Sequence, residues 1–104
     1  MGFNMQKLMQ QAQKMQANVA RVQEGLKEMQ VEGVSGGGMV RVLANGAQEI
    51  VGISIDPQVI DPDDAEMLED LVLAAMREAQ NAARELAAQE MGKVTGGMGM
   101  PGLF

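Results

Sequence analysis

The feature that most constrains the fold is an uninterrupted apolar repeat near the beginning of the chain. Residues 4–30 contain no proline, and their apolar side chains recur in alternating steps of three and four residues, at Met5, Leu8, Ala12, Met15, Val19, Val22, Leu26 and Met29. Such a heptad pattern predicts one long amphipathic helix with a single apolar seam.

The length of this helix limits how the rest of the chain can cover it. The helix would be about 40 Å long at 1.5 Å per residue. A compact chain of about 100 residues has a diameter of only about 33 Å. The helix therefore has to pack against a long partner helix, project from the domain, or do both. We expect a homodimer in which the paired helix or a second copy covers Leu8, Met15, Val19, Val22 and Leu26.

Three segments after this helix have the pattern of an antiparallel β-meander. Residues 39–44 have the alternating, β-branched side-chain pattern of a half-buried strand. Residues 48–55 form a return strand, and residues 31–35 supply a weaker edge strand. The dipeptide Asn45-Gly46 predicts a two-residue type I′ turn, because both central residues of that turn need a positive φ. The alternation predicts that the return strand turns three side chains toward the core, Val51, Ile53 and Ile55.

A second helix is predicted from residue 61 to about Met91. Asp61 is placed to act as its N-cap, and Pro62 fits the first helical position. Residues 92–104 are rich in glycine and methionine, which predicts a flexible tail. We therefore expect one α+β domain over residues 1–91, made of a long N-terminal helix, a three-stranded antiparallel β-meander and a C-terminal helix.

The side chains that the chain lacks exclude most catalytic and cofactor chemistry. There is no cysteine and no histidine, so thiolate nucleophiles, imidazole bases and the usual zinc and haem ligands are missing. There is no tryptophan or tyrosine, so aromatic platforms for single-stranded nucleic acid are missing too. No apolar run is long enough to span a membrane. We expect no enzyme activity, no cofactor, no metal and no membrane insertion.

Five segments, taken together, carry a family resemblance. They are Asn45-Gly46-Ala47, Ile-Ser-Ile-Asp-Pro at 53–57, Glu-Met-Leu-Glu-Asp-Leu-Val at 66–72, the Met/Gln/Lys-rich residues 5–16, and the Gly/Met/Pro tail. This combination resembles the YbaB/EbfC family of bacterial nucleoid-associated proteins. The resemblance implies a tweezer-like homodimer in the cytoplasm and nucleoid, which binds double-stranded DNA with little sequence specificity and alters its conformation. It also implies roles in nucleoid organisation and gene regulation.

Basic charge is concentrated at the beginning of the chain, although the net charge is −6. The first 23 residues hold Lys7, Lys14 and Arg21 and no acidic residue. Their spacing of seven residues places them in one column beside the apolar seam. We expect this column to contact DNA phosphates, which carry no sequence information. Arg84 on the second helix and Lys93, just after its predicted end, are weaker candidates.

Two other interpretations of the charges remain open. The basic column could be no more than solvated charge on the outer face of a coiled coil. The chain could also be an acidic homodimeric module whose second helix and exposed seam engage a DNA-processing protein. Salt separates these possibilities, because phosphate binding weakens steeply as salt rises, whereas an apolar helix groove responds little.

Overall fold

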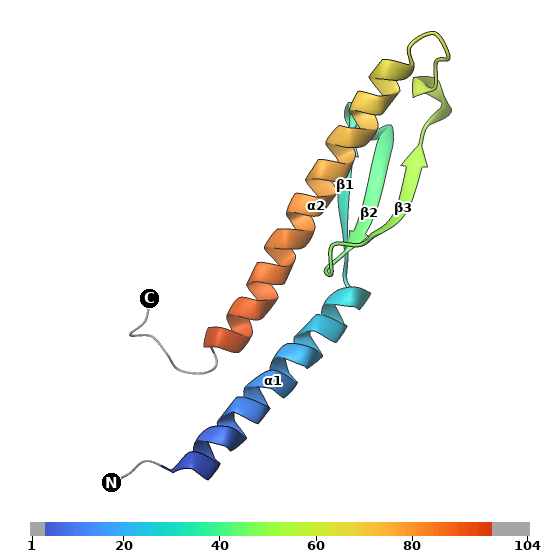
Figure 1. The fold of residues 1–104 in the computed structure, drawn as a ribbon. Helices are drawn as coiled ribbons and strands as arrows, with labels where there is room; N and C mark the ends of the chain where they lie inside the picture. Colours follow the sequence, from blue (N-terminus) through green and yellow to red (C-terminus); the bar gives the residue numbers. More distant parts are fainter. Residues whose placement is uncertain (1–3, 97–104) are drawn as a thin grey trace.

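The computed structural model describes residues 4–96 of an elongated α+β chain (Figure 1). The radius of gyration is 20.2 Å and the principal extents are 75 × 24 × 16 Å, whereas a compact chain of this length would have a radius of gyration of about 13 Å. The elements follow the predicted order: α1 (Met5–Glu28), β1 (Gln30–Ser35), β2 (Val40–Asn45), β3 (Ile50–Ile55) and α2 (Ala65–Gly96), with short 3-10 turns at Gly36–Gly38 and Pro57–Val59.

Helix α1 confirms the long N-terminal helix and begins at a side-chain cap. The carboxamide oxygen of Asn4 accepts hydrogen bonds from the backbone N–H groups of Gln6 and Lys7 at 3.0 and 3.3 Å, which satisfies donors that have no partner within the helix. The helix ends at Glu28, two residues before the predicted end, because the chain turns into an extended conformation at Met29.

Helix α2 begins three residues later than its first predicted helical position, so the prediction of Asp61 as N-cap was wrong. The cap is Asp64, whose carboxylate accepts the N–H of Met67 at 3.2 Å. Asp61 instead closes the preceding turn, where its carboxylate accepts the N–H of Asp63 at 2.9 Å. Pro62 lies in that turn and not in the helix. At its other end α2 continues to Gly96, beyond the predicted Met91, and the tail from residue 97 lies outside the described residues.

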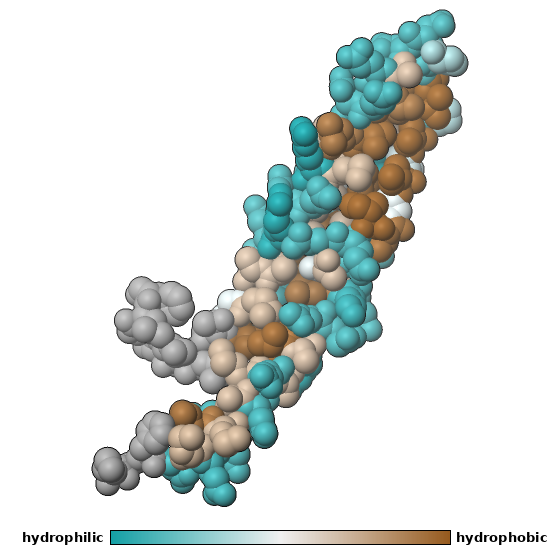
Figure 2. All heavy atoms as spheres, viewed as in Figure 1, coloured by the Kyte–Doolittle hydropathy of each residue, from teal (hydrophilic) through white to brown (hydrophobic). Residues whose placement is uncertain are grey.

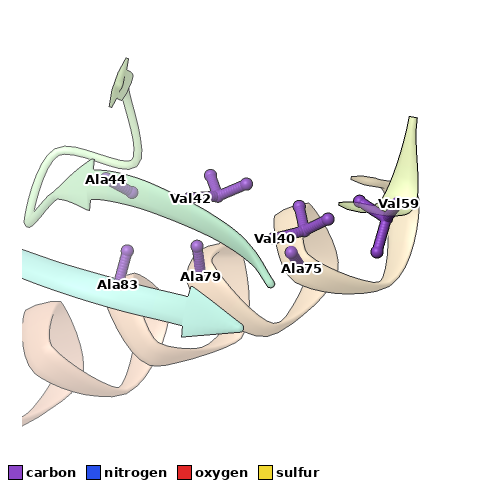
Figure 3. Close-up of a cluster of buried hydrophobic side chains, with 7 residues drawn as sticks. All are labelled: Val40, Val42, Ala44, Val59, Ala75, Ala79 and Ala83. Atoms are coloured by element: carbon purple, nitrogen blue, oxygen red, sulfur yellow. The ribbon is translucent and has the colours of Figure 1, made fainter. Parts of the chain in front are cut away.

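The core lies between α2 and the first two strands of the antiparallel sheet, whose order is β1-β2-β3. Figure 3 shows small side chains of α2 directed toward the valines of β2. Gly33 of β1 permits this close approach, because a Cβ there would lie 2.2 Å from the carbonyl oxygen of Ala75. The fully or nearly buried cluster consists of Val40, Val42, Ala44, Val59, Ala75, Ala79 and Ala83.

The turn between β2 and β3 differs from the predicted type I′ hairpin. Among the described residues, the positive φ in this loop belongs to Gln48, at 67°, and not to Asn45 or Gly46. The Gln48 N–H donates to the Asn45 carbonyl oxygen at 3.0 Å. The Asn45 side chain accepts the N–H groups of Ala47 and Glu49, both at 3.0 Å. The loop is therefore longer than two residues, and β3 begins at Ile50.

The predicted burial of β3 side chains is also wrong for two of the three residues. Ile53 pairs with Val42 and therefore shares the sheet face on which α2 packs, yet it is 50% exposed and Val51 is 49% exposed. Ile55 is half-buried against the core. The reason is that α2 packs on β1 and β2 and makes only sparse contact with β3.

One side-chain hydrogen bond joins the end of β1 to α2, and its removal is expected to lower stability modestly. The Ser35 hydroxyl donates to the Leu71 carbonyl oxygen at 2.6 Å in a partly buried position. Ser35→Ala is therefore expected to lower the free energy of unfolding by about 1 kcal/mol, as measured by urea denaturation. Ser54→Ala on the exposed part of β3 is the matched control. Equal stability of the two variants would contradict a stabilising role for this bond.

Candidate nucleic-acid interface

The N-terminal part of α1 projects away from the sheet, and we call Met5–Arg21 the arm (Figure 1). Of the α1 side chains, all of which the structure describes, only Leu26 is buried. Exposure increases toward the N-terminal end: Met15 and Val19 are half-buried, whereas Leu8 is 50% exposed. The predicted seam is thus covered at its base and open along the arm.

The three predicted basic residues lie on the arm with exposed side chains. Lys7 and Lys14 border a shallow surface depression of about 390 Å³ together with Gln10 and Gln11. The Arg21 guanidinium donates to the Asn18 side-chain oxygen at 3.1 Å, which is a neutral partner, so the charge of Arg21 is not compensated. The two glutamines were not among the predicted site residues, although their three- and four-residue spacing from Lys7 indicates a shared helix face.

Ion pairs neutralise other basic residues but none on the arm. In the part of the chain that the structure describes, these pairs are Lys27–Glu24 at 3.6 Å, Arg41–Glu32 at 2.9 Å and Lys93–Glu90 at 3.0 Å. The arm itself contains no acidic residue. Its positive charge is therefore available to an anionic partner.

The two weaker candidates lie on α2, in the half of that helix that runs beside α1 (Figure 1). Arg84 donates to the side-chain oxygen of Asn81 and keeps an uncompensated charge. Lys93 pairs with Glu90, so its charge is partly cancelled within the helix. Both side chains are exposed. Of the two, Arg84 is better suited to contact a phosphate.

A second exposed surface is apolar and lies on the α/β body. Figure 2 shows hydrophobic residues gathered over β3 and the adjoining turns of α2. Three large apolar side chains, Val51, Ile53 and Leu73, are each close to half exposed, and together we call them the apolar surface. Large exposed apolar patches in folded proteins mark sites of association.

The described residues offer little support for other site chemistry. Among residues 4–96, no three His, Cys, Asp or Glu side chains are grouped so that they could hold a metal ion. No helix in the same part of the chain is long and apolar enough to cross a membrane.

Comparisons with known proteins give one family match, several relatives and a solved structure with the same fold. The model of the YbaB/EbfC DNA-binding family matches residues 1–98. A nucleoid-associated protein of Caldanaerobacter subterraneus subsp. tengcongensis is 53% identical over 99% of this chain and 93% of its own length. One from Acetivibrio thermocellus is 54% identical over 99% and 92%. The crystal structure of an uncharacterized Helicobacter pylori protein shares the fold, with a TM-score of 0.80 and 24% identity over 89% of this chain and 98% of that one.

Proposed function

The chain belongs to the YbaB/EbfC DNA-binding family, and on that premise we propose that it is a nucleoid-associated protein whose arm binds double-stranded DNA with little sequence specificity. The observation that carries the proposal is the exposed basic column on an arm without acidic residues. Lys7, Lys14 and Arg21 follow one another at intervals of about 10.5 Å along the helix axis. Such a column suits the regularly spaced phosphates of a duplex, and phosphate contacts are independent of sequence.

The side chains of the arm favour binding of duplex DNA over binding of single strands. Aromatic side chains, on which unpaired bases stack, are absent from Met5–Arg21. Lysine, arginine and glutamine side chains remain, and these donate hydrogen bonds to phosphate oxygens. The position in the cell that follows from this activity is the bacterial nucleoid, within the cytoplasm.

We further propose that the working form is a homodimer, in which a second copy covers the apolar surface. A single copy leaves Val51, Ile53 and Leu73 between 46% and 50% exposed, and association would remove this area from water. A dimer carries two arms and therefore six basic side chains in the two columns. Two arms that contact one duplex at separate places can bend it, which is how the protein would alter DNA conformation.

A charge placed within the apolar surface tests the dimer. Ile53→Glu is expected to convert a dimeric mass into a monomeric mass in light scattering at micromolar concentration, because an unpaired carboxylate cannot be buried cheaply. Ser54→Glu adds the same charge at the next residue, which lies on the opposite sheet face. That control should remain dimeric. A dimeric Ile53→Glu protein would place the contact between copies elsewhere.

The binding test uses the unmodified protein with two unrelated duplexes and one single strand. Fluorescence anisotropy is measured at two salt concentrations. The proposal expects similar affinity for both duplexes, weaker binding of the single strand, and a steep loss of affinity as salt rises. Absence of duplex binding at low salt would contradict the DNA-binding role.

A protein-interaction module is the second candidate, and the open seam of the arm favours it. Ala12, Met15 and Val19 line a groove of about 430 Å³ together with Gln16, Ala20 and Gln23. An amphipathic helix of a DNA-processing protein fits such a groove. Binding that is insensitive to salt, with no affinity for duplex DNA, would support this candidate instead.

A further inference from the structure

Besides packing beside α2, the C-terminal end of α1 meets the turn between β2 and β3 at one small contact. Helix α1 ends at Glu28 and β1 begins at Gln30, so a single residue, Met29, joins them. The backbone N–H of Gly46, in the turn between β2 and β3, donates to the carbonyl oxygens of Leu26 and Met29 at 2.8 and 3.0 Å. One N–H group is thus hydrogen-bonded both to the last turn of α1 and to Met29, the residue that connects α1 to β1.

The space at Gly46 is as restricted as its hydrogen bonding. A Cβ at this position would lie 2.6 Å from Cδ2 of Leu26, 2.7 Å from its carbonyl oxygen and 2.9 Å from its Cβ. The positive-φ glycines of the described residues are Gly36, Gly37 and Gly38. A glycine is therefore required at position 46 because the turn approaches Leu26 closely, and not because the backbone there is left-handed.

The turn that carries Gly46 is fixed, so α1 is the part that has to move if the contact changes. Asn45 is only 5% exposed. Its side chain accepts two backbone N–H groups of the turn and donates to the Glu49 carboxylate at 2.8 Å. Leu26, which faces this turn, is 4% exposed.

We propose that Gly46 is a positioning residue that sets the direction in which the arm leaves the body, and thereby where its basic column meets DNA. Lys7 lies about 28 Å along the helix axis from Leu26, so a tilt of about 10° at the base displaces it by about 5 Å. That displacement is comparable with the spacing between neighbouring phosphates of one strand, about 3.4 Å along the axis. The proposal rests on the DNA-binding function proposed above.

The test compares two glycine-to-alanine substitutions near the base of the arm. Gly46→Ala adds a methyl group against Leu26, whereas Gly25→Ala adds one where no atom lies within 4 Å. The chain has no cysteine, so cysteines introduced at the exposed Gln13 and Gln80 carry the only two spin labels. The distance between them is measured by double electron–electron resonance, with excess unlabelled protein so that each dimer contains at most one labelled copy.

The expected result is a shifted or broadened distance distribution for Gly46→Ala and an unchanged one for Gly25→Ala. Gly46→Ala should also bind duplex DNA severalfold more weakly, although it retains every charge. An unchanged distribution in folded Gly46→Ala protein would overturn the proposal, as would a shifted distribution with unchanged DNA affinity. Circular dichroism and light scattering establish that each variant is folded and assembled like the parent.

A second variant decides the question if Gly46→Ala does not fold. Leu26→Ala removes the other side of the same contact without adding volume, and it should broaden the distance distribution in the same way. An unchanged distribution in Leu26→Ala would then overturn the proposal. Failure of the unsubstituted protein to bind DNA would contradict the proposed function instead, and the distances would still decide whether Gly46 sets the direction of the arm.

Discussion

Replacement of Lys7, Lys14 and Arg21 together by glutamine is expected to lower the affinity for duplex DNA by about a thousandfold at moderate salt. Each phosphate neutralised contributes a slope of about −0.9 to the dependence of log affinity on log salt. A dimer with two arms loses up to six such contacts, so the slope should flatten markedly. Glutamine preserves helix propensity and side-chain length, so the fold and the dimer should persist. Anisotropy titrations over a range of salt measure both quantities.

A matched control separates the position of the charges from their number. Glutamine at Lys27, Arg41 and Arg77 produces the same net charge, but these residues lie outside the arm and two of them already form ion pairs. This control should retain most of the affinity and most of the salt slope. If both triple variants lose affinity equally, total charge governs binding. If the arm variant binds like the parent, the basic column is not the DNA surface.

Gly33→Ala is expected to have the largest effect on folding. A Cβ at this position would lie 2.2 Å from the Ala75 carbonyl oxygen and 2.3 Å from the Ala79 nitrogen. Both are backbone atoms of α2, so no side-chain rotation relieves the clash and the helix has to move off the sheet. Overpacked cores cost about 1–3 kcal/mol, and more where the backbone shifts, out of a total stability of about 5–15 kcal/mol.

Gly52→Ala is the control for this prediction. Its added Cβ would lie 3.8 Å from Cδ1 of Leu43, which is an ordinary contact on a neighbouring strand. Guanidinium denaturation should show a loss of several kcal/mol for Gly33→Ala, or no cooperative unfolding at all, against a small change for Gly52→Ala. Native stability in Gly33→Ala would mean that α2 can shift without cost.

The sequence predicted the order and type of the two α-helices and the three strands because those depend on local periodicity. The heptad pattern of α1 and the alternation of β2 are strong signals in a short window. The N-cap of α2 was misplaced because four of the residues preceding the helix, Asp61 to Asp64, each suit a cap or a turn. Only the register of the turn, set by hydrogen bonds, decides between Asp61 and Asp64.

Burial of β3 could not be predicted because alternation identifies a face but not what covers it. The position of α2 over β1 and β2 follows from a match between Gly33 and the alanines at 75 and 79, which are far apart in the sequence. The prediction of a type I′ turn was wrong for a similar reason. Gly46 contacts α1, and rules based on the residues of the turn alone do not include that contact.

The residues of the candidate site could be predicted from the sequence, but the ion pairs that they form could not. The heptad arithmetic places Lys7, Lys14 and Arg21 on one side of an exposed helix, and the structure confirms their exposure. Their role in DNA binding stays a prediction. The neutralisation of Lys93 by Glu90 became evident only from the distance between them, since the spacing permits a pair without requiring one.

The molecule is long, and it carries basic charge on the projecting arm and acidic charge at the opposite end. No basic residue stands between Arg41 and Arg77, where eight acidic residues are found, and the loop that leads into α2 lies at the opposite end from the arm (Figure 1). The 75 Å extent of the molecule is many times the screening length of about 8 Å at physiological salt. Near a duplex the arm is attracted while the far end is repelled, so the molecule is turned arm-first before contact. In the function proposed above, DNA coated in this way would have an acidic outer layer, and neighbouring coated segments would repel one another.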